Sequence, residues 1–227
     1  MALSREQIIQ AAVEILRTYG LADLTMRRLA RELGVQPGAL YWHIANKQEL
    51  LGAVASHLFD APQYPHVSGP APSSPAPSGP TPSGPAPPDP AAARRLAHEV
   101  RSTLLGVRDG AEVAALAYAL NPDTLAPVDR LQSILETEGA SGRQAHWGAR
   151  ALAHYILGSV AAEQAQAELA AAGSTESHQC PPSGDSGDET ETDQSFSFGV
   201  DMMLAGLRGQ YGVTVNQPLS PPAPRSP

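Results

Sequence analysis

Residues 24–51, LTMRRLARELGVQPGALYWHIANKQELL, decide the fold of this chain. Thr25 can cap a helix over residues 25–32, because its hydroxyl can accept a backbone N–H of the first turn. Gly34 allows a tight turn, and Pro37 suits the first turn of a second helix over residues 36–42. Two short helices joined by a Gly-containing turn predict a helix-turn-helix, whose second helix lies in the major groove of DNA.

The flanking sequence extends this motif to a three-helix unit. Ser4 and Gln7 form a capping box that begins a helix over residues 4–19, along which apolar residues make one stripe. A second capping box begins another helix over residues 46–60. We therefore expect a helix-turn-helix DNA-binding domain over residues 1–47.

The rest of the chain also predicts helices, because apolar residues recur at three and four positions and alanine is abundant. We expect an all-α fold, with a helical effector-binding and dimerisation domain over residues 48–212. Composition predicts a disordered Pro-rich insert at 62–90, an acidic flexible loop at 173–195 and a disordered tail at 213–227. The further helices are predicted at 91–107, 110–119, 123–138, 142–172 and 195–211.

Charge and composition limit the classes of function. The formal net charge is −8, but residues 1–59 hold six basic and five acidic groups, so the acidity lies in the remainder. This balance permits DNA binding by a head whose cations share one face. The chain has one cysteine, shows no signal peptide, and has no run of about 20 apolar residues, so we expect no membrane association and a cytoplasmic, nucleoid-associated location.

The surface of the motif carries suitable chemistry. Tyr41 and His43 can donate to phosphates or base edges, Arg27 can reach guanine or phosphate, and Lys47 suits a phosphate. The alternative is an ordinary surface on a small bundle whose core is covered by Tyr41 and Trp42. The candidate DNA-binding residues are Thr25, Met26, Arg27, Arg28, Gln36, Pro37, Gly38, Ala39, Tyr41, Trp42, His43 and Lys47.

The long string quoted above resembles the DNA-binding domain of the tetracycline-repressor (TetR) family, and LYWHIANK is especially close. Downstream, RDGAEV at 108–113, LGSVAAEQ at 157–164 and FSFGVDMMLAGL at 196–207 resemble segments of the family's regulatory domain. The resemblance implies a homodimeric repressor that binds a palindromic, double-stranded operator and is released by a small effector.

The resemblance also assigns roles to single residues. It implies phosphate contacts at Thr25 or Met26, Tyr41 and Lys47, and a base-reading arginine at Arg27. Trp42 and His43 match the end of the recognition helix. The family's base-reading Gln-Pro-Thr triplet falls on Pro37, Gly38 and Ala39, so the operator should differ. Gln36 could contribute one base contact or serve as an N-cap.

The resemblance implies that the effector differs as well. In the family a drug–magnesium chelate is held by a histidine and approached by an acidic residue of the partner subunit; those positions fall on Ala114 and Ala162. Neither alanine can bind a metal. A one-residue shift of the alignment would place Glu163 at the position of the acidic residue, but it would not restore the histidine. We expect a small hydrophobic effector and no metal or cofactor; alternatively, the same residues fill an ordinary core. The candidate effector pocket comprises Leu96, Val100, Leu104, Val113, Ala114, Leu116, His154, Tyr155 and Gln164.

The helices at 142–172 and 195–211 resemble those that pair with their symmetry mates in a four-helix interface. Dimerisation is also required if two recognition helices are to enter successive major grooves. The candidate interface residues are Ile156, Val160, Phe198, Met202 and Met203.

An enzyme is the main alternative from another class. The seven histidines show no HExxH spacing, and no GxSxG, P-loop or dinucleotide fingerprint occurs. Cys180 lies in the acidic tract, a poor setting for an activated thiolate. We expect no catalytic or metal site. A transcriptional activator or an effector-independent DNA-binding protein remains open.

Overall fold

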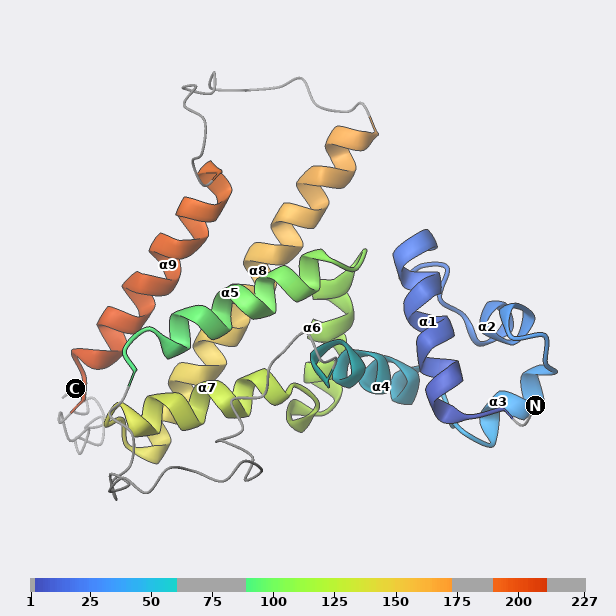
Figure 1. Cartoon of the computed structure of the whole chain (residues 1–227), viewed down its shortest axis with the longest axis horizontal. Coiled ribbons are helices and arrows are strands. Elements are labelled where there is room, and N and C mark those ends of the chain that lie inside the picture. The colour runs from blue at the N-terminus through green and yellow to red at the C-terminus, as the bar shows by residue number, and fades with distance from the viewer. Residues whose placement is uncertain (1–2, 61–88, 173–189, 212–227) are drawn as a thin grey trace, which may run out of the picture.

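The computed structural model describes residues 3–60, 89–172 and 190–211 of the chain. Over these ranges the fold is all-α, as predicted, and contains no strand (Figure 1). Within the same ranges no helix is both long and apolar enough to cross a membrane. The elements are α1 (Arg5–Tyr19), α2 (Met26–Glu32), α3 (Pro37–Tyr41), α4 (Lys47–Asp60), α5 (Ala92–Leu105), α6 (Gly110–Leu120), η1 (Pro122–Thr124), α7 (Ala126–Thr137), α8 (Gly142–Ala171) and α9 (Glu191–Arg208).

The head consists of α1, α2 and α3, and its local signals act as predicted. The Ser4 hydroxyl accepts from the Gln7 backbone N–H at 3.2 Å while the Gln7 side chain accepts from the Ser4 N–H at 3.0 Å. Thr25 caps α2, and Gly34 takes the left-handed conformation with φ +66°, which glycine adopts without strain. Leu40 is fully buried, which fixes α3 against the head.

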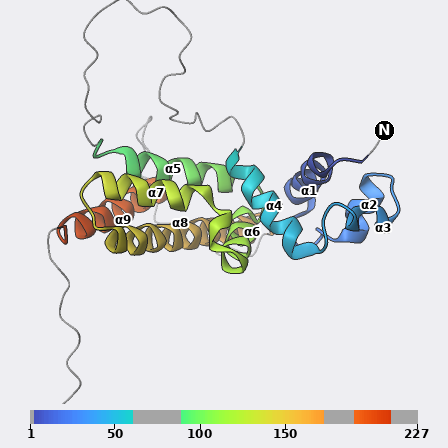
Figure 2. The same cartoon turned by 90° about the horizontal axis from the view of Figure 1, so that it is seen from below.

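The body is built around α8. In Figure 2, α5 and α7 lie on one side of α8, α9 lies next to α8, and α4 runs between the body and the head. α4 can belong to both units because it packs on α1 of the head and on α6 of the body. Its Leu50, Val54 and Ala55 are fully buried between them. A movement inside the body therefore has a direct mechanical route to the head.

Two predicted helices differ most from the structure. The helix expected at 123–138 divides into η1 and α7, because Leu125 leaves the helical conformation and Pro127 begins a new first turn. α9 begins at Glu191 rather than at 195, because Thr190 and Asp193 form a capping box. The last residues of the tract expected to be a flexible loop are therefore helical. The rest of that loop with Cys180, residues 62–88 of the predicted insert and the tail lie outside the described residues, whereas the last two residues of the insert are described and Asp89 forms an ion pair with Arg95.

Candidate nucleic-acid interface and regulatory core

α3 presents an unusual surface for so short a helix. Leu40 and Ile44 are fully buried and hold it to the head, while Tyr41 is 53% exposed and Trp42 90% exposed. Trp42 covers none of the bundle core, so that alternative does not account for it. A large aromatic side chain with an N–H donor, left almost wholly in solvent beside a helix-turn-helix, is typical of a surface that contacts a partner.

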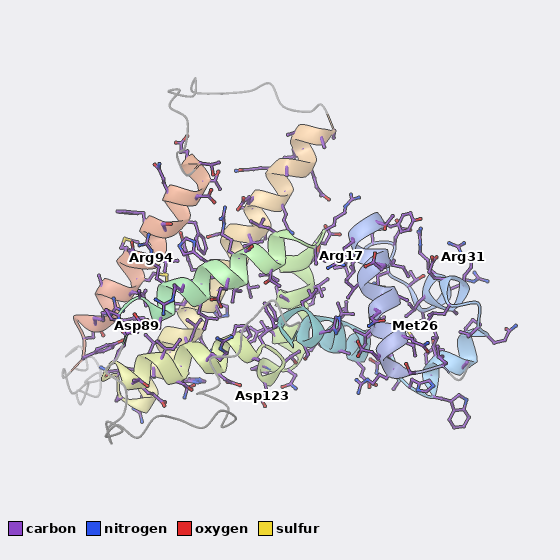
Figure 3. All side chains as sticks on the ribbon, in the orientation of Figure 1. Arg17, Met26, Arg31, Asp89, Arg94 and Asp123 are labelled. Atoms are coloured by element: carbon purple, nitrogen blue, oxygen red, sulfur yellow. The ribbon has the colours of Figure 1, made fainter. Side chains whose placement is uncertain are left out.

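The cations of α2 divide into two groups. Arg27 and Arg31 are exposed, and Figure 3 shows Arg31 on the side of the head that points away from the body. Arg28 was predicted to be available to DNA, but it forms an ion pair with Asp23 and its guanidinium carbon lies 3.6 Å from the centre of the Tyr19 ring. Arg28 therefore fixes α2 to the end of α1, and the α2 cations that stay exposed are Arg27 and Arg31.

The exposed cations border a hollow of about 560 Å³ beside α2, lined in part by Thr25, Arg27, Arg31 and Pro37. The Thr25 oxygen accepts from the Arg28 backbone N–H at 3.1 Å, so its own hydrogen remains free to donate. Two arginines and a hydroxyl around one concave surface provide the donors that phosphate oxygens require.

The remaining predicted contacts are placed as follows. Met26, labelled in Figure 3, is half-buried against the head core, so its thioether does not project into the hollow. Lys47, the first residue of α4, is exposed, whereas His43 and Ala39 are half-buried.

The N-terminal end of α3 is nearly featureless. Gln36 stands at the N-cap position, but its side chain makes no capping hydrogen bond, so the amide is free to pair with a base edge. Pro37 and Gly38 are exposed, and a Cβ added at Gly38 would meet no atom within 4 Å. The exposed surface at this end therefore consists of one amide followed by small groups.

The predicted effector residues do not line one open cavity. Leu96, Val100, Leu104, Val113 and Ala114 are at most 6% exposed and belong to a continuous core, which favours the core interpretation for them. By contrast, Leu116 is 41% exposed and His154 is also exposed. The side chain of Tyr155 stacks on Phe196, with ring centres 5.7 Å apart.

The side chain of Gln164 is also committed to the fold. Its amide donates to the carbonyls of Leu104 and Val107 at 3.0 and 2.8 Å and accepts from the Ala111 N–H at 3.2 Å. These bonds join Gln164, on α8, to the end of α5 and the start of α6. The amide is therefore not available to an effector unless these bonds break.

A small apolar void of about 20 Å³ does lie in the body, where α4, α5, α7 and α8 meet. All its lining side chains are apolar, so it fits an apolar occupant, but only after the surrounding helices move apart. Val100 is the one predicted pocket residue among its walls. Sequence reasoning missed the others, for which burial was the only available signal: Phe59, Leu125, Pro127, Val128, Leu131, Ala153, Ile156 and Leu157.

The residues at the family's metal position do not fit a metal. Ala114 is fully buried and Ala162 is exposed, and both end in a methyl group. Glu163 is held in a bidentate pair by Arg101, at 3.0 Å to each oxygen, and Arg101 also donates to Asp193 at 2.6 Å. Arg101 is only 8% exposed, so this cluster joins α5, α8 and α9 inside the body. Hydrogen bonds from Thr190 and Arg101 lower the pKa of Asp193.

The candidate dimer residues fall into two sets. Phe198 and Met202 on α9 are 69% and 60% exposed, and Trp147 on α8 is 56% exposed. Ile156 and Val160 are 1% and 0% exposed because they pack inside their own protomer. Met203 is half-buried. The apolar surface open to a second copy therefore lies on the outer faces of α8 and α9.

A contact that sequence reasoning missed ties the head to the body. Asp109, just before α6, accepts a hydrogen bond from the Leu21 N–H at 2.6 Å. Asp109 holds the left-handed conformation with φ +56°, which is strained for a residue other than glycine. Neighbouring Gly20 leaves room for it, since a Cβ there would lie 2.6 Å from the Asp109 carboxylate. The resemblance of RDGAEV, residues 108–113, to a family segment does not by itself predict that this segment contacts the head.

Comparison with known proteins gives a consistent result. The family model for bacterial regulatory proteins of the tetR family matches residues 8–54, and the model for the tetracyclin repressor-like C-terminal domain matches residues 84–211. The tetracycline repressor protein class G of Vibrio anguillarum is 32% identical over 212 residues, which cover 90% of this chain and 93% of that protein.

Two solved structures are similarly related. BioQ of Mycobacterium smegmatis is 32% identical, with a TM-score of 0.65, over 91% of this chain and 98% of that chain. A structure of BioQ with its natural double-stranded DNA operator is 31% identical, with a TM-score of 0.61, over the same shares of the two chains.

Proposed function

This chain belongs to the TetR family of bacterial regulatory proteins and is a DNA-binding transcriptional regulator; from that premise we propose that it is a homodimeric repressor which a small, mostly apolar effector releases from a palindromic operator. The observation that carries the proposal is the head surface, where exposed Tyr41 and Trp42 follow a buried Leu40 and exposed arginines border a hollow. The related BioQ structure with its operator supports DNA as the partner.

On the DNA, α3 enters the major groove and the exposed side chains take separate tasks. Arg27 reads a guanine or binds a phosphate, and the free amide of Gln36 pairs with a base edge, adenine being the best match. Thr25, Tyr41 and Lys47 bind phosphates and set the register of the head. Pro37, Gly38 and Ala39 bring the backbone close to the groove floor and leave room for thymine methyl groups.

Dimerisation places two heads on one site. The exposed faces of α8 and α9, which carry Trp147, Phe198 and Met202, pack against the same faces of a second copy. Small residues on α8, among them Ala151 and Gly158, are exposed on this helix and allow close approach. Two recognition helices then lie about 34–36 Å apart, one turn of the DNA helix.

Release requires that the effector bind more tightly to the conformation whose heads do not fit the operator than to the DNA-binding conformation. An apolar molecule that widens the void among α4, α5, α7 and α8 would displace α4, which also packs on the head. The Asp109–Leu21 hydrogen bond would pass the movement of the α5–α6 corner to the turn after α1. The filled core implies that the effector must open its own space.

Selection of bound sequences from a random DNA pool tests the DNA-binding part, because a dimer gives a palindromic consensus and a monomer a single half-site. Release is then tested by titrating small apolar compounds against the protein–operator complex. An active compound must bind the free protein more tightly than the complex, by the same factor by which it weakens operator binding. Equal affinities in the two states would refute release, and a regulator that no compound displaces would favour effector-independent binding.

A further inference from the structure

A second hollow, of about 230 Å³, lies between the head and the body. Its walls come from α1 of the head, from the bridging helix α4, and from the end of α5 and the turn after it. Figure 3 shows Arg17 on the side of α1 that faces the body. The lining residues are Gln10, Val13, Glu14, Arg17, His57, Leu58, Ser102, Thr103, Gly106 and Val107.

The position of this hollow matters more than its size. A ligand shifts an equilibrium between two conformations only by the difference in its affinity for them. Because the walls belong to both units, any change in the angle between head and body changes the shape of the hollow. The Asp109–Leu21 hydrogen bond lies at the same junction. A molecule seated here would touch both moving parts at once, whereas the void in the body core touches the bridging helix α4 but none of the head helices.

The chemistry of the walls favours an acceptor. Glu14 already accepts from Arg17 at 2.9 Å, and Gln10 donates to Glu6 at 3.1 Å. Arg17 keeps most of its N–H groups, because this exposed i,i+3 pair uses only one of them and contributes little to stability. The side chains of Ser102 and Thr103, exposed and half-buried respectively, add two hydroxyl groups to the wall. The free donors of the hollow are therefore the remaining N–H groups of Arg17 and the two hydroxyls, and Arg17 is the cation that already pairs with the neighbouring Glu14 carboxylate.

The floor of the hollow is apolar, since Val13, Leu58 and Val107 are 4%, 6% and 2% exposed. A volume of 230 Å³ is smaller than the roughly 300–1,000 Å³ of pockets for drug-sized ligands. We propose that this junction is a second regulatory site, which binds a small monocarboxylate with an apolar body, its carboxylate on Arg17 and its body on Val13, Leu58 and Val107.

The coupling of this site to DNA, which rests on the proposed function, can be tested before the natural ligand is known. In full-length protein with Cys180→Ser, Ser102→Cys places a single thiol on the wall of the hollow. The reagent 2-carboxyethyl methanethiosulfonate then forms a disulfide with that thiol and releases methanesulfinate. Ser133→Cys, on the exposed face of α7, is the matched control.

Operator affinity is measured before and after complete modification, as verified by mass spectrometry. Modification at residue 102 should change operator affinity at least 5-fold, the lower end of typical allosteric coupling, and modification at residue 133 less than 2-fold. Equal effects at the two positions would overturn the coupling. The unmodified protein is measured first, so that failure to bind any operator counts against the proposed function rather than this site.

The class of ligand is tested with benzoate, benzylamine and benzyl alcohol, which share a body and differ in the polar group. Benzoate should bind saturably in calorimetry, and Arg17→Gln should weaken it at least 5-fold while Arg130→Gln on α7 leaves it unchanged. Preference for benzylamine would overturn the carboxylate assignment, as would benzoate binding that ignores Arg17→Gln. The cationic reagent 2-(trimethylammonium)ethyl methanethiosulfonate gives the matching comparison at Ser102→Cys.

Discussion

Replacement of Asp109 by alanine should loosen the head from the body without altering the DNA-contacting surface. The carboxylate of Asp109 is the only part of the side chain that joins the two units, through the 2.6 Å bond from the Leu21 N–H. Leu21 is 7% exposed, so its N–H does not gain full access to water when the acceptor is lost.

The magnitude follows from two terms. A hydrogen bond to a charged partner contributes about 1.5–3 kcal/mol. The left-handed backbone at Asp109 costs a residue with a Cβ about 1–2 kcal/mol, which alanine still bears and glycine does not. We expect Asp109→Ala to destabilise the junction by about 2–3 kcal/mol, and Asp109→Gly by about 1 kcal/mol less because strain relief offsets part of the loss.

Hydrogen exchange measures this junction directly. The amide of Leu21 and its neighbours in the turn after α1 should exchange roughly 10- to 100-fold faster in Asp109→Ala, and operator affinity should respond less steeply to an effector. Asp129→Ala, on the first turn of α7, is the matched control. If both variants exchange at the same rate around Leu21, the carboxylate does not hold the head and this account of the junction is wrong.

Four further outcomes are expected. Arg27→Ala should weaken operator binding by about 1–3 kcal/mol at one base position, as measured by a mobility-shift assay. Arg28→Ala should instead lower the unfolding temperature of the head, as measured by calorimetry. Arg101→Ala should destabilise the body by about 1.5–3 kcal/mol in urea unfolding, because the partly exposed carboxylates of Glu163 and Asp193 lose their charged hydrogen-bond donor. Hydrogen bonds lower the pKa of Asp193 below its usual value of 3.8. The ionised carboxylate therefore stabilises the fold above pH 3.8, and this stabilisation is lost as the pH falls through the lowered pKa. The stability of Asp193→Asn in acid unfolding should therefore depend less on pH than that of the unchanged protein. Phe198→Arg should convert the dimer to monomer in sedimentation analysis and abolish operator binding, whereas Gln132→Arg on α7 should do neither.

The features predicted correctly are those encoded within a few residues. Ser4 with Gln7 and Ser141 with Gln144 form capping boxes that begin helices where expected, and the class of fold and the family follow from the helix-turn-helix string. Capping is a local interaction, so its signal survives in the sequence alone. The start of α9 was misplaced because Thr190 lies within a tract whose composition predicts disorder.

The features that could not be predicted depend on neighbours distant in sequence. Nothing near Arg28 shows that Tyr19 and Asp23 occupy its guanidinium, so its exposure was overestimated. α8 is 30 residues long and rich in alanine, so its periodicity does not decide which face meets the core. Ile156 was therefore assigned to the dimer interface although it is buried in the protomer.

The empty surroundings of Gly38 bear on how regulators of this kind diversify. Its backbone is not in the left-handed region and no atom lies within 4 Å of an added Cβ, so many side chains can occupy this position without loss of folding. Most mutations in a protein must be balanced against stability, but here a single codon change alters only the surface offered to DNA. After a gene duplication, one copy could acquire a new operator while the other keeps the old, with neither passing through a poorly folded intermediate.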